Sequence, residues 1–562
     1  MKKNTWMMTA IMGIVLAGAM PTQASDWTPT GGGDWHTGGN WSVGVPDASG
    51  AVANFNSDIT SDISVDLSAS ATVGTVTFED AADAGSGYNS FTINGANTLT
   101  FDGGATVNAN RGTNNEIAVD INTGSQQLQV HVPVAGDKVV FSGSITGTGG
   151  LQKYNDVGAI ELLGDNSAWS GTKLFRVGRY GVGSDTCFGS GTVQINSGTI
   201  YSVGGDRIAT NIVVSNTGAV ALDFDGANGY SLNFTADFAL AFANVSGPGR
   251  LVFSGNMTSI GTLQGMNSSG RIDLSGSNGT PATVRAKDVG RSLTLGIGHD
   301  YALGTGASIN IVRDVTLVSM GQARTITQNL PMNSATLTVD GDFGLTLAGN
   351  LTANGGSQLL VKNGLSSLTL LGNNTYAGGT TINGGLIVVG HTNALGAAGT
   401  ITVNSNGTLA VANGIAFSRA VTFNAGSALG GEGTFSPGSA WSVPVNGFVR
   451  PGLPIGTLTV DQNVTFGDNR TLEIDFASDD SADKLIVSGT IDLTSLSDRI
   501  VLRGELGSAS EYEVANATAV NGEFDLIDSS GLIPTGARIL YPGDGRILVL
   551  QPPLKGTVIM IR

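Results

Sequence analysis

The chain has 562 residues and a formal net charge of −17, from 44 acidic and 27 basic residues. This charge argues against binding to nucleic acid or to anionic membrane surfaces. Its 84 glycines follow no Gly-X-Y period, which excludes collagen. The apolar fraction is 40%, and it recurs in short alternating strands, so a packed core is expected rather than disorder.

The N-terminus has the features of a secretory signal peptide. Lys2 and Lys3 precede an apolar run from Met7 to Met20, and small residues follow. The run is short for a membrane span, so we expect cleavage after Ala24 and no membrane-spanning helix in the mature chain. The protein is therefore expected outside the inner membrane, at the cell surface or in the medium.

Residues 361–414 carry the clearest structural pattern. Apolar residues alternate in pairs, and clusters of Gly and Asn separate the pairs. Alternating apolar residues in short segments that turn residues separate predict short β-strands. Such strands need stacked neighbours to bury their apolar face. The inward positions are expected to include Leu368, Leu370, Leu395 and Leu409.

The motifs of this segment also resemble a known family, the autotransporter-associated β-strand repeat of bacterial passenger domains. The resemblance rests on Leu368-Thr369-Leu370, Gly372-Asn373-Asn374-Thr375-Tyr376, Gly378-Gly379-Thr380-Thr381-Ile382-Asn383, Asn393-Ala394-Leu395-Gly396 and Gly407-Thr408-Leu409. Looser copies are Gly164-Asp165-Asn166-Ser167-Ala168-Trp169, Phe188-Gly189 and His299-Asp300-Tyr301-Ala302-Leu303-Gly304.

Two flanking segments extend the resemblance. Trp35 and Trp41, followed by Phe55, are similar to the opening of such chains, where tryptophans cap the first coil. Arg450-Pro451-Gly452 and the 484–490 segment are similar to the part before the last coils. The resemblance implies a right-handed parallel β-helix, a β-solenoid of pectin-lyase-like architecture. We expect three short strands per coil.

The expected organisation has five parts. They are a signal peptide (1–24), an N-terminal capping segment (25–55), the main β-helix (56–474), closing β-coils (475–550) and a tail (551–562). Pro552 and Pro553 in the tail would stop strand propagation. Too few residues follow Asp475 for a translocator barrel, so self-export is not expected of this chain.

No catalytic, cofactor-binding or metal-ligating residue is predicted. The four histidines, His36, His131, His299 and His391, have no metal-ligand spacing, and the last two occupy equivalent repeat positions that indicate a turn role. Cys187 is expected to be a buried, inert thiol. Trp169 and Tyr376 are equivalent and are expected to cover a strand end rather than to stack on sugars.

One acidic cluster remains as a candidate site. Asp475, Asp479, Asp480 and Asp483 could bind Ca²⁺ weakly, although a solvated loop between two coils is favoured.

Two functions remain open at this stage. The first is a non-enzymatic, adhesin-like or structural surface protein, with cell-surface or extracellular polysaccharides or host and matrix surfaces as partners. The alternative is a polysaccharide-binding or polysaccharide-degrading β-helix. A cleft lined by two or three carboxylates would favour the alternative, whereas a uniform Gly/Ser/Asn/Thr surface would favour the first.

Overall fold

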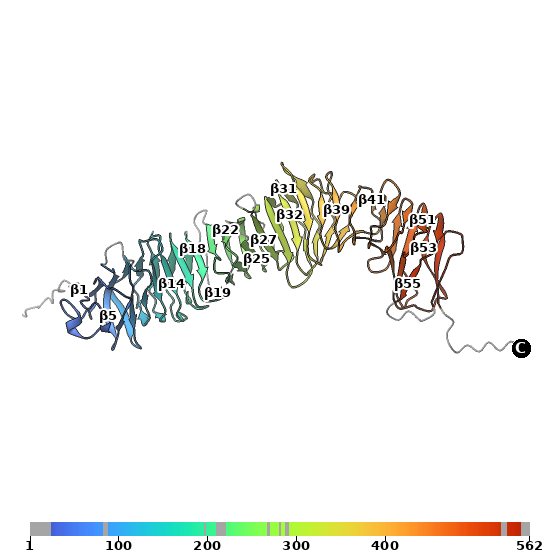
Figure 1. The fold of residues 1–562 in the computed structure, drawn as a ribbon. Helices are drawn as coiled ribbons and strands as arrows, with labels where there is room; N and C mark the ends of the chain where they lie inside the picture. Colours follow the sequence, from blue (N-terminus) through green and yellow to red (C-terminus); the bar gives the residue numbers. More distant parts are fainter. Residues whose placement is uncertain are drawn as a thin grey trace, which may run out of the picture. The chain divides into compact units, whose positions relative to one another are not determined.

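The computed structural model describes residues 24–81, 88–154, 156–195, 198–209, 221–235, 237–266, 270–279, 281, 283–286, 291–529 and 537–551. The chain divides into two compact units, residues 1–192 and 193–562. Strands dominate both units (Figure 1), and the described residues contain no α-helix, only the 3-10 turn η1 (Gly38–Asn40). Residues 1–23 of the predicted signal peptide and the two tail prolines lie outside the described residues, whereas Ala24 begins β1.

Unit 1 is built from two parallel sheets whose strands alternate along the chain. The first contains β1 (Ala24–Asp26), β3 (Val52–Phe55), β5 (Ala71–Phe78), β7 (Thr98–Ala109), β10 (Leu128–His131), β13 (Leu151–Lys153) and β15 (Lys173–Phe175), with β9 (Asp120–Asn122) and β12 (Ile145–Thr146) beside them. The second contains β2 (Gly33–Asp34), β4 (Ile63–Asp66), β6 (Phe91–Asn94), β8 (Asn115–Ile117), β11 (Lys138–Phe141), β14 (Ala159–Leu162) and β16 (Arg179–Val182).

Unit 2 begins with β17 (Val193–Ile195) and continues the same alternation in two long stacks. One contains β18 (Thr199–Ser202), β20 (Ala221–Asp225), β22 (Phe238–Ser246), β24 (Met257–Gly265), β26 (Thr283–Ala286), β28 (Asn310–Val312), β31 (Leu330–Asn333) and β34 (Leu351–Ala353). The other contains β19 (Arg207–Ala209), β21 (Ser231–Phe234), β23 (Arg250–Phe253), β25 (Gly270–Leu274), β27 (Ser292–Ile297), β29 (Asp314–Ser319), β32 (Thr336–Asp340), β35 (Leu359–Lys362), β37 (Thr380–Ile382), β39 (Ile401–Val403) and β42 (Thr422–Phe423).

Three further sheets complete unit 2. The sheet that positions the site below contains β30 (Arg324–Ile326), β33 (Leu345–Leu347), β36 (Ser367–Leu370), β38 (Gly385–Val389), β40 (Gly407–Val411), β43 (Ala428–Gly431), β46 (Phe448–Pro451), β49 (Thr471–Phe476), β52 (Arg499–Gly504) and β55 (Leu526–Ser529). The others contain β41 (Ala416–Phe417), β44 (Thr434–Phe435), β47 (Thr457–Val460), β50 (Lys484–Val487), β53 (Glu511–Asn516), β57 (Arg546–Leu550) and β56 (Arg538–Leu540), and β45 (Trp441–Ser442), β48 (Val464–Thr465), β51 (Thr490–Leu493) and β54 (Ala519–Gly522).

The register of the parallel strand pairs places residues of the same type above one another in successive coils. Leu345 pairs with Leu368 and Leu347 with Leu370, and all four side chains are buried. Because strand side chains alternate between faces, every second residue joins this core. The predicted inward positions Leu395 and Leu409 are also fully buried. The all-β parallel solenoid predicted from the sequence is thus confirmed.

The number of strands per coil varies. The coil from β32 to β34 has the predicted three strands. In the repeat at residues 361–414, however, no strand lies between Leu370 and Thr380. There the Asn374 side chain takes over the bonds of a strand ladder. Its Oδ1 accepts the Leu351 N–H of the preceding coil at 2.7 Å, and its Nδ2 donates to the Ala394 carbonyl of the next coil at 2.6 Å.

This asparagine clamp recurs in both units. In unit 1, Asn166 accepts from Ile145 at 2.6 Å and donates to the Cys187 carbonyl at 2.7 Å. In unit 2, Asn278 accepts from Met257 at 2.8 Å and donates to a carbonyl at 2.9 Å. The clamps link three successive coils where a buried backbone group would otherwise lack a partner. They explain why the repeat motif carries Asn at this position.

Aromatic side chains close the start of the first stack, as the sequence predicts. Trp27, Trp35 and Trp41 are almost fully buried and surround Phe55 at ring-centroid distances of 5.5–5.8 Å. The Trp41 Nε1–H donates to the Trp35 carbonyl at 2.6 Å. The exposed end of the hydrophobic core is thereby covered.

Three lysines lie inside the coils, which the sequence pattern did not indicate. Lys153, Lys173 and Lys362 are fully buried, and each ammonium donates to backbone carbonyls at a corner of its coil. Burial lowers the pKa of each to about 8. These ammonium groups satisfy carbonyls that the turns leave outside the strand ladders.

Candidate functional site

The histidines of the repeats have the structural role predicted for them. The His299 Nδ1 accepts the Tyr301 N–H at 3.0 Å, and the His391 Nδ1 accepts the Asn393 N–H at the same distance. Each histidine ring therefore closes a turn by accepting the backbone N–H of the residue two positions later. The equivalent turn of unit 1 has Ser184, whose hydroxyl accepts the Thr186 N–H at 3.2 Å.

The equivalent aromatic residues Trp169 and Tyr376 cannot provide a sugar-stacking face, because both are fully buried. The Tyr376 hydroxyl is 2.6 Å from the Thr380 hydroxyl, and the Trp169 Nε1–H donates to the Gly149 carbonyl at 2.5 Å. Cys187 is also fully buried, as predicted. All three side chains belong to the core.

The acidic cluster 475–483 does not form one solvated loop. Asp479 and Asp480 are exposed, and Asp480 accepts the Ala509 N–H at 2.8 Å and the Ser508 hydroxyl at 2.8 Å, which fastens the loop to the next coil. Asp483 is only 1% exposed. The favoured interpretation as a solvated loop is therefore wrong for Asp483, because the loop folds back and carries it inside.

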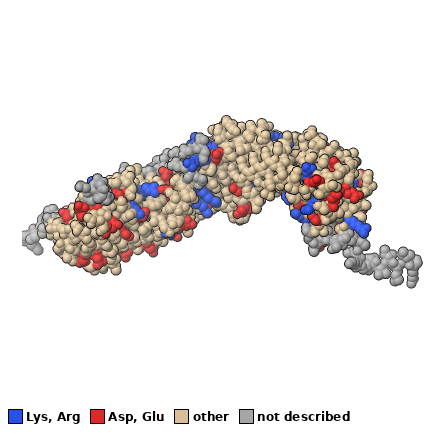
Figure 2. All heavy atoms as spheres, in the orientation of Figure 1, with Lys and Arg blue, Asp and Glu red and all other residues tan. Residues whose placement is uncertain are grey.

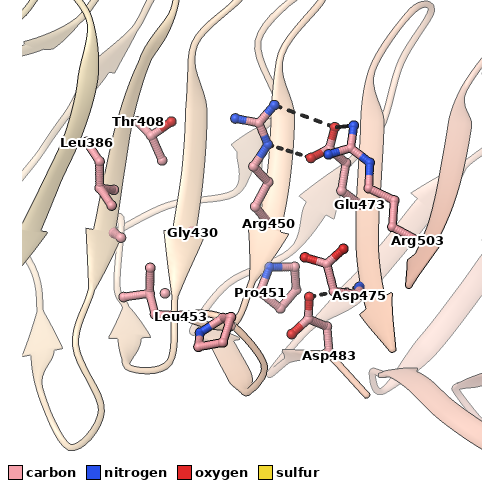
Figure 3. A pocket seen from close by; sticks show the side chains of 14 residues that line it. Leu386, Thr408, Gly430, Arg450, Pro451, Leu453, Glu473, Asp475, Asp483 and Arg503 are labelled. Carbon is pink, nitrogen blue, oxygen red and sulfur yellow. Dashed lines mark hydrogen bonds and ion pairs between the residues drawn. The ribbon is translucent and has the colours of Figure 1, made fainter. Parts of the chain in front are cut away.

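Asp475 and Asp483 line a hollow of about 460 Å³ on the outer side of the sheet that contains β43, β46 and β49 (Figure 3). The small residues Ala410 and Gly430 contribute to the lining, and a Cβ added to Gly430 would lie 2.7 Å from the Arg450 carbonyl oxygen. The rest is lined by Leu386, Thr408, Gly431, Arg450, Pro451, Gly452, Leu453, Pro454, Glu473 and Arg503.

One side of the hollow is an Arg–Glu–Arg cluster. Glu473 is nearly buried, and the two arginines approach its carboxylate from opposite sides (Figure 3). Arg450 Nε lies 2.6 Å from Oε2, and Arg503 Nη2 lies 3.0 Å from Oε1. Strand register creates this cluster, because β49 runs between β46 and β52. Each oxygen of the Glu473 carboxylate thus meets a guanidinium group.

Asp483 holds the loop that follows the Arg-Pro-Gly motif against β49. Its Oδ1 accepts the Gly456 N–H at 3.0 Å and its Oδ2 accepts the Asp475 N–H at 3.0 Å. Burial raises the pKa of Asp483 to about 7, and the nearby carboxyls of Asp475 and Glu432 act in the same direction. Both oxygens of Asp483 are therefore already occupied by backbone donors.

The Asp475 side chain differs from its two acidic neighbours. It is half-buried and lines the hollow, and burial raises its pKa from 3.8 although Arg503 opposes this shift. Its carboxyl is thus the acidic group of the hollow that is placed to meet a ligand. In the sequence Asp475 stands next to the acidic loop, and only the strand register places it beside Arg503.

Among the described residues, no group of three or more His, Cys, Asp or Glu side chains is arranged to hold a metal ion. No described helix has the length and apolarity needed to cross a membrane.

Residues 360–389 match the family model called passenger-associated-transport-repeat. The chain is also 26% identical over 368 residues to the adhesin BmaC autotransporter of Brucella suis biovar 1 (strain 1330). The resemblance to autotransporter passenger proteins is thereby confirmed. The aligned part covers 52% of this chain and 10% of that relative, so the chain matches about a tenth of the relative's length.

Proposed function

We propose that this passenger-type chain is exported, is displayed at the cell surface or released, and adheres to partners through its outer surface without turning over a substrate. The observation that carries the proposal is the repeat match at 360–389, together with the similarity to an autotransporter that is named an adhesin. Those matches support a surface passenger, and the adhesive role is our inference.

The outer surface of the central coils suits many weak contacts. Between Asp342 and Arg419 the only Asp, Glu, Lys or Arg is Lys362, which is buried. Figure 2 shows this part, around β32 and β39, as almost free of charge on the visible face. Repeated hydroxyl and amide groups there can contact a repeating partner at several coils, and each engaged coil raises the effective concentration at the next.

Asparagine side chains line up along this surface. Asn383 donates to Asn363 at 2.9 Å, Asn404 to Asn383 at 2.7 Å and Asn424 to Asn404 at 2.6 Å. The same amide position thus repeats from coil to coil, about twenty residues apart (20 or 21 in each pair). A partner with a matching repeat would meet the same group at every coil.

The experiment combines cell fractionation with adhesion of the purified chain to matrix-coated and polysaccharide-coated surfaces. We expect the chain in the envelope or the medium, and saturable adhesion that a Thr381→Asp/Thr402→Asp variant weakens severalfold. The matched control, Thr457→Asp/Thr459→Asp, places the same charges on β47, which pairs with the strand β50 that carries Lys484. Cytoplasmic retention, or adhesion that both variants leave unchanged, would contradict the proposal.

The polysaccharide-degrading alternative is tested in the same preparation. Glycoside hydrolysis needs two carboxyl groups that are free to act as acid and as base or nucleophile. Glu473 is held by two arginines and Asp483 by two backbone N–H groups, so this requirement is not met in the hollow. We expect no new reducing ends from neutral or acidic polysaccharides, and their release in amounts that scale with the protein would promote the enzymatic alternative.

A further inference from the structure

We propose that the hollow bounded by Thr408, Arg450, Asp475 and Arg503 is a recognition site for one or two sugar units of a neutral polysaccharide. The inference rests on the proposed adhesive function and assigns one of its contacts to a defined place.

The size is suitable. The hollow has a volume of about 460 Å³, within the range of about 300–1,000 Å³ that is usual for small-molecule sites. Ala410, Gly430 and Gly431 leave this space because their neighbours in the same sheet, Arg450 above all, have much larger side chains. Small residues flanked by large ones in the same sheet thus leave a hollow on an otherwise regular strand face.

The polar groups are rigidly placed and incompletely used. Glu473 fixes both guanidinium groups, yet Arg450 and Arg503 remain 40% and 49% exposed in their side chains, so N–H groups are left to face a ligand. The Asp475 carboxyl faces the same space (Figure 3). Carboxylate and guanidinium groups both bond two adjacent hydroxyls at once, which is the arrangement on a sugar ring.

The remaining lining fits the other side of such a ring. Leu386, Pro451 and Leu453 bring apolar atoms to the hollow, and Thr408 adds a hydroxyl that can donate or accept. A few convergent polar groups among apolar ones are typical of ligand sites. The C–H face of a sugar can lie on the apolar residues while its hydroxyls meet the charged ones.

The charged side chains that line the hollow favour a neutral ligand over an acidic one. The carboxyl groups of Glu473 and Asp475 line the hollow against two guanidinium groups, and the buried Asp483, whose oxygens already accept two backbone N–H groups, adds a third acidic side chain. Glu432 adds a further acidic group beside Asp483. An acidic or sulfated sugar would bring more negative charge to this balance, whereas a neutral one would not.

The test measures binding of neutral gluco-, manno- and galacto-configured hexasaccharides to the purified full chain by calorimetry and by ligand-observed magnetic resonance, with an oligogalacturonate and a hexalysine peptide as comparisons. We expect saturable binding of at least one neutral hexasaccharide and none of the oligogalacturonate. Asp475→Asn should weaken this binding at least tenfold, as should Thr408→Tyr, which places a ring at the mouth of the hollow.

Matched controls separate binding from folding. Asp461→Asn changes an exposed carboxyl after β47, and Thr459→Tyr adds the same ring to the outer face of β47. Both should bind as the unchanged chain does, and all four variants should keep its midpoint of thermal unfolding within a few degrees. Absence of binding to every neutral hexasaccharide, binding that Asp475→Asn and Thr408→Tyr leave unchanged, or preferential binding of hexalysine would overturn the proposal.

The adhesion assay distinguishes the two proposals. If the chain adheres but binds no neutral hexasaccharide, the adhesive function stands and this site assignment fails. If the chain binds a hexasaccharide in the hollow but never adheres to any surface, the site stands and the adhesive function fails.

Discussion

At the scale of single residues, the effect of a substitution on stability depends on whether the side chain points into the core or towards water. Leu370 is fully buried, and it pairs with Leu347 on one side and Val389 on the other. Leu365, five residues earlier in the sequence, is 84% exposed. The same apolar residue type therefore occupies two opposite environments within one coil.

Leu370→Asp should destabilise unit 2 severely, by more than about 4 kcal/mol, because it buries an unpaired charge in the core. Leu365→Asp should change the unfolding free energy by less than about 0.5 kcal/mol, since its side chain reaches water. Chemical denaturation followed by circular dichroism measures both. Equal midpoints for the two variants would show that the inward face has been misassigned.

Asp483 predicts a pH dependence of stability. Burial raises its pKa to about 7, so between pH about 4 and 7 the folded chain holds a proton that the unfolded chain has released. The contribution of this carboxyl to stability is therefore complete below pH about 4 and is lost as the pH rises towards 7.

Asp483→Asn should reduce this slope of unfolding free energy against pH without abolishing it, because the buried Asp498 carboxyl, whose pKa burial raises to about 6, titrates in the same range. Asp479→Asn should keep it, because hydrogen bonds from Ser481 lower the pKa of that exposed carboxyl. Thermal unfolding at closely spaced pH values between 4 and 7 makes the comparison. A slope that is unchanged in Asp483→Asn would assign the whole effect to other groups.

At the scale of the element, the asparagine clamp joins successive coils where no strand ladder does. Asn374→Ala leaves the Leu351 N–H and the Ala394 C=O without their partner, at a cost of roughly 2–5 kcal/mol for two buried groups. Asn373→Ala is the matched control, since Asn373 is exposed. Denaturant titration of both variants should show the large loss for Asn374→Ala alone.

The aromatic cap is a second element with a defined role. Trp35 is fully buried against Trp41 and Phe55, at centroid distances of 5.0 and 5.7 Å. Trp35→Ala should cost unit 1 about 3–5 kcal/mol, as other large-to-small core changes do. Hydrogen exchange should then rise in β1, β3 and β5 and stay unchanged in unit 2. Uniformly raised exchange throughout the chain would refute a local cap.

At the scale of the whole molecule, each coil contacts mainly the coils before and after it. The strands of a sheet pair in sequence, for example β33 with β36 and β36 with β38. Stability in such stacks is a sum of coil and neighbour terms. We therefore expect a milder core change, Leu370→Ala, to raise hydrogen exchange first in β33, β36 and β38, and least in unit 1. Equal loss of protection everywhere would indicate a single cooperative core.

The alternation of apolar residues determined much by itself, because a strand places every second side chain on the same face. It predicted the solenoid and the inward leucines, and the repeat spacing predicted the turn role of His299 and His391. The burial of Cys187 was predicted from its place as a small core residue before Phe188. The domain boundaries at 24, 55, 474 and 550 stay predictions, as do the absence of a catalytic centre and any calcium binding by the acidic cluster.

Only the tertiary structure decided which polar residues meet. Asp483 is buried because its loop folds back. Lys362 occupies an inward position of β35, where its ammonium donates to a turn carbonyl, and a pattern of apolar residues does not predict a charged side chain there. Arg450, Glu473 and Arg503 come from three different coils, and strand register alone brings them together. The number of residues in the loops between strands sets that register, and no local pattern specifies it. The strand faces could thus be read from the sequence, whereas the hollow could not.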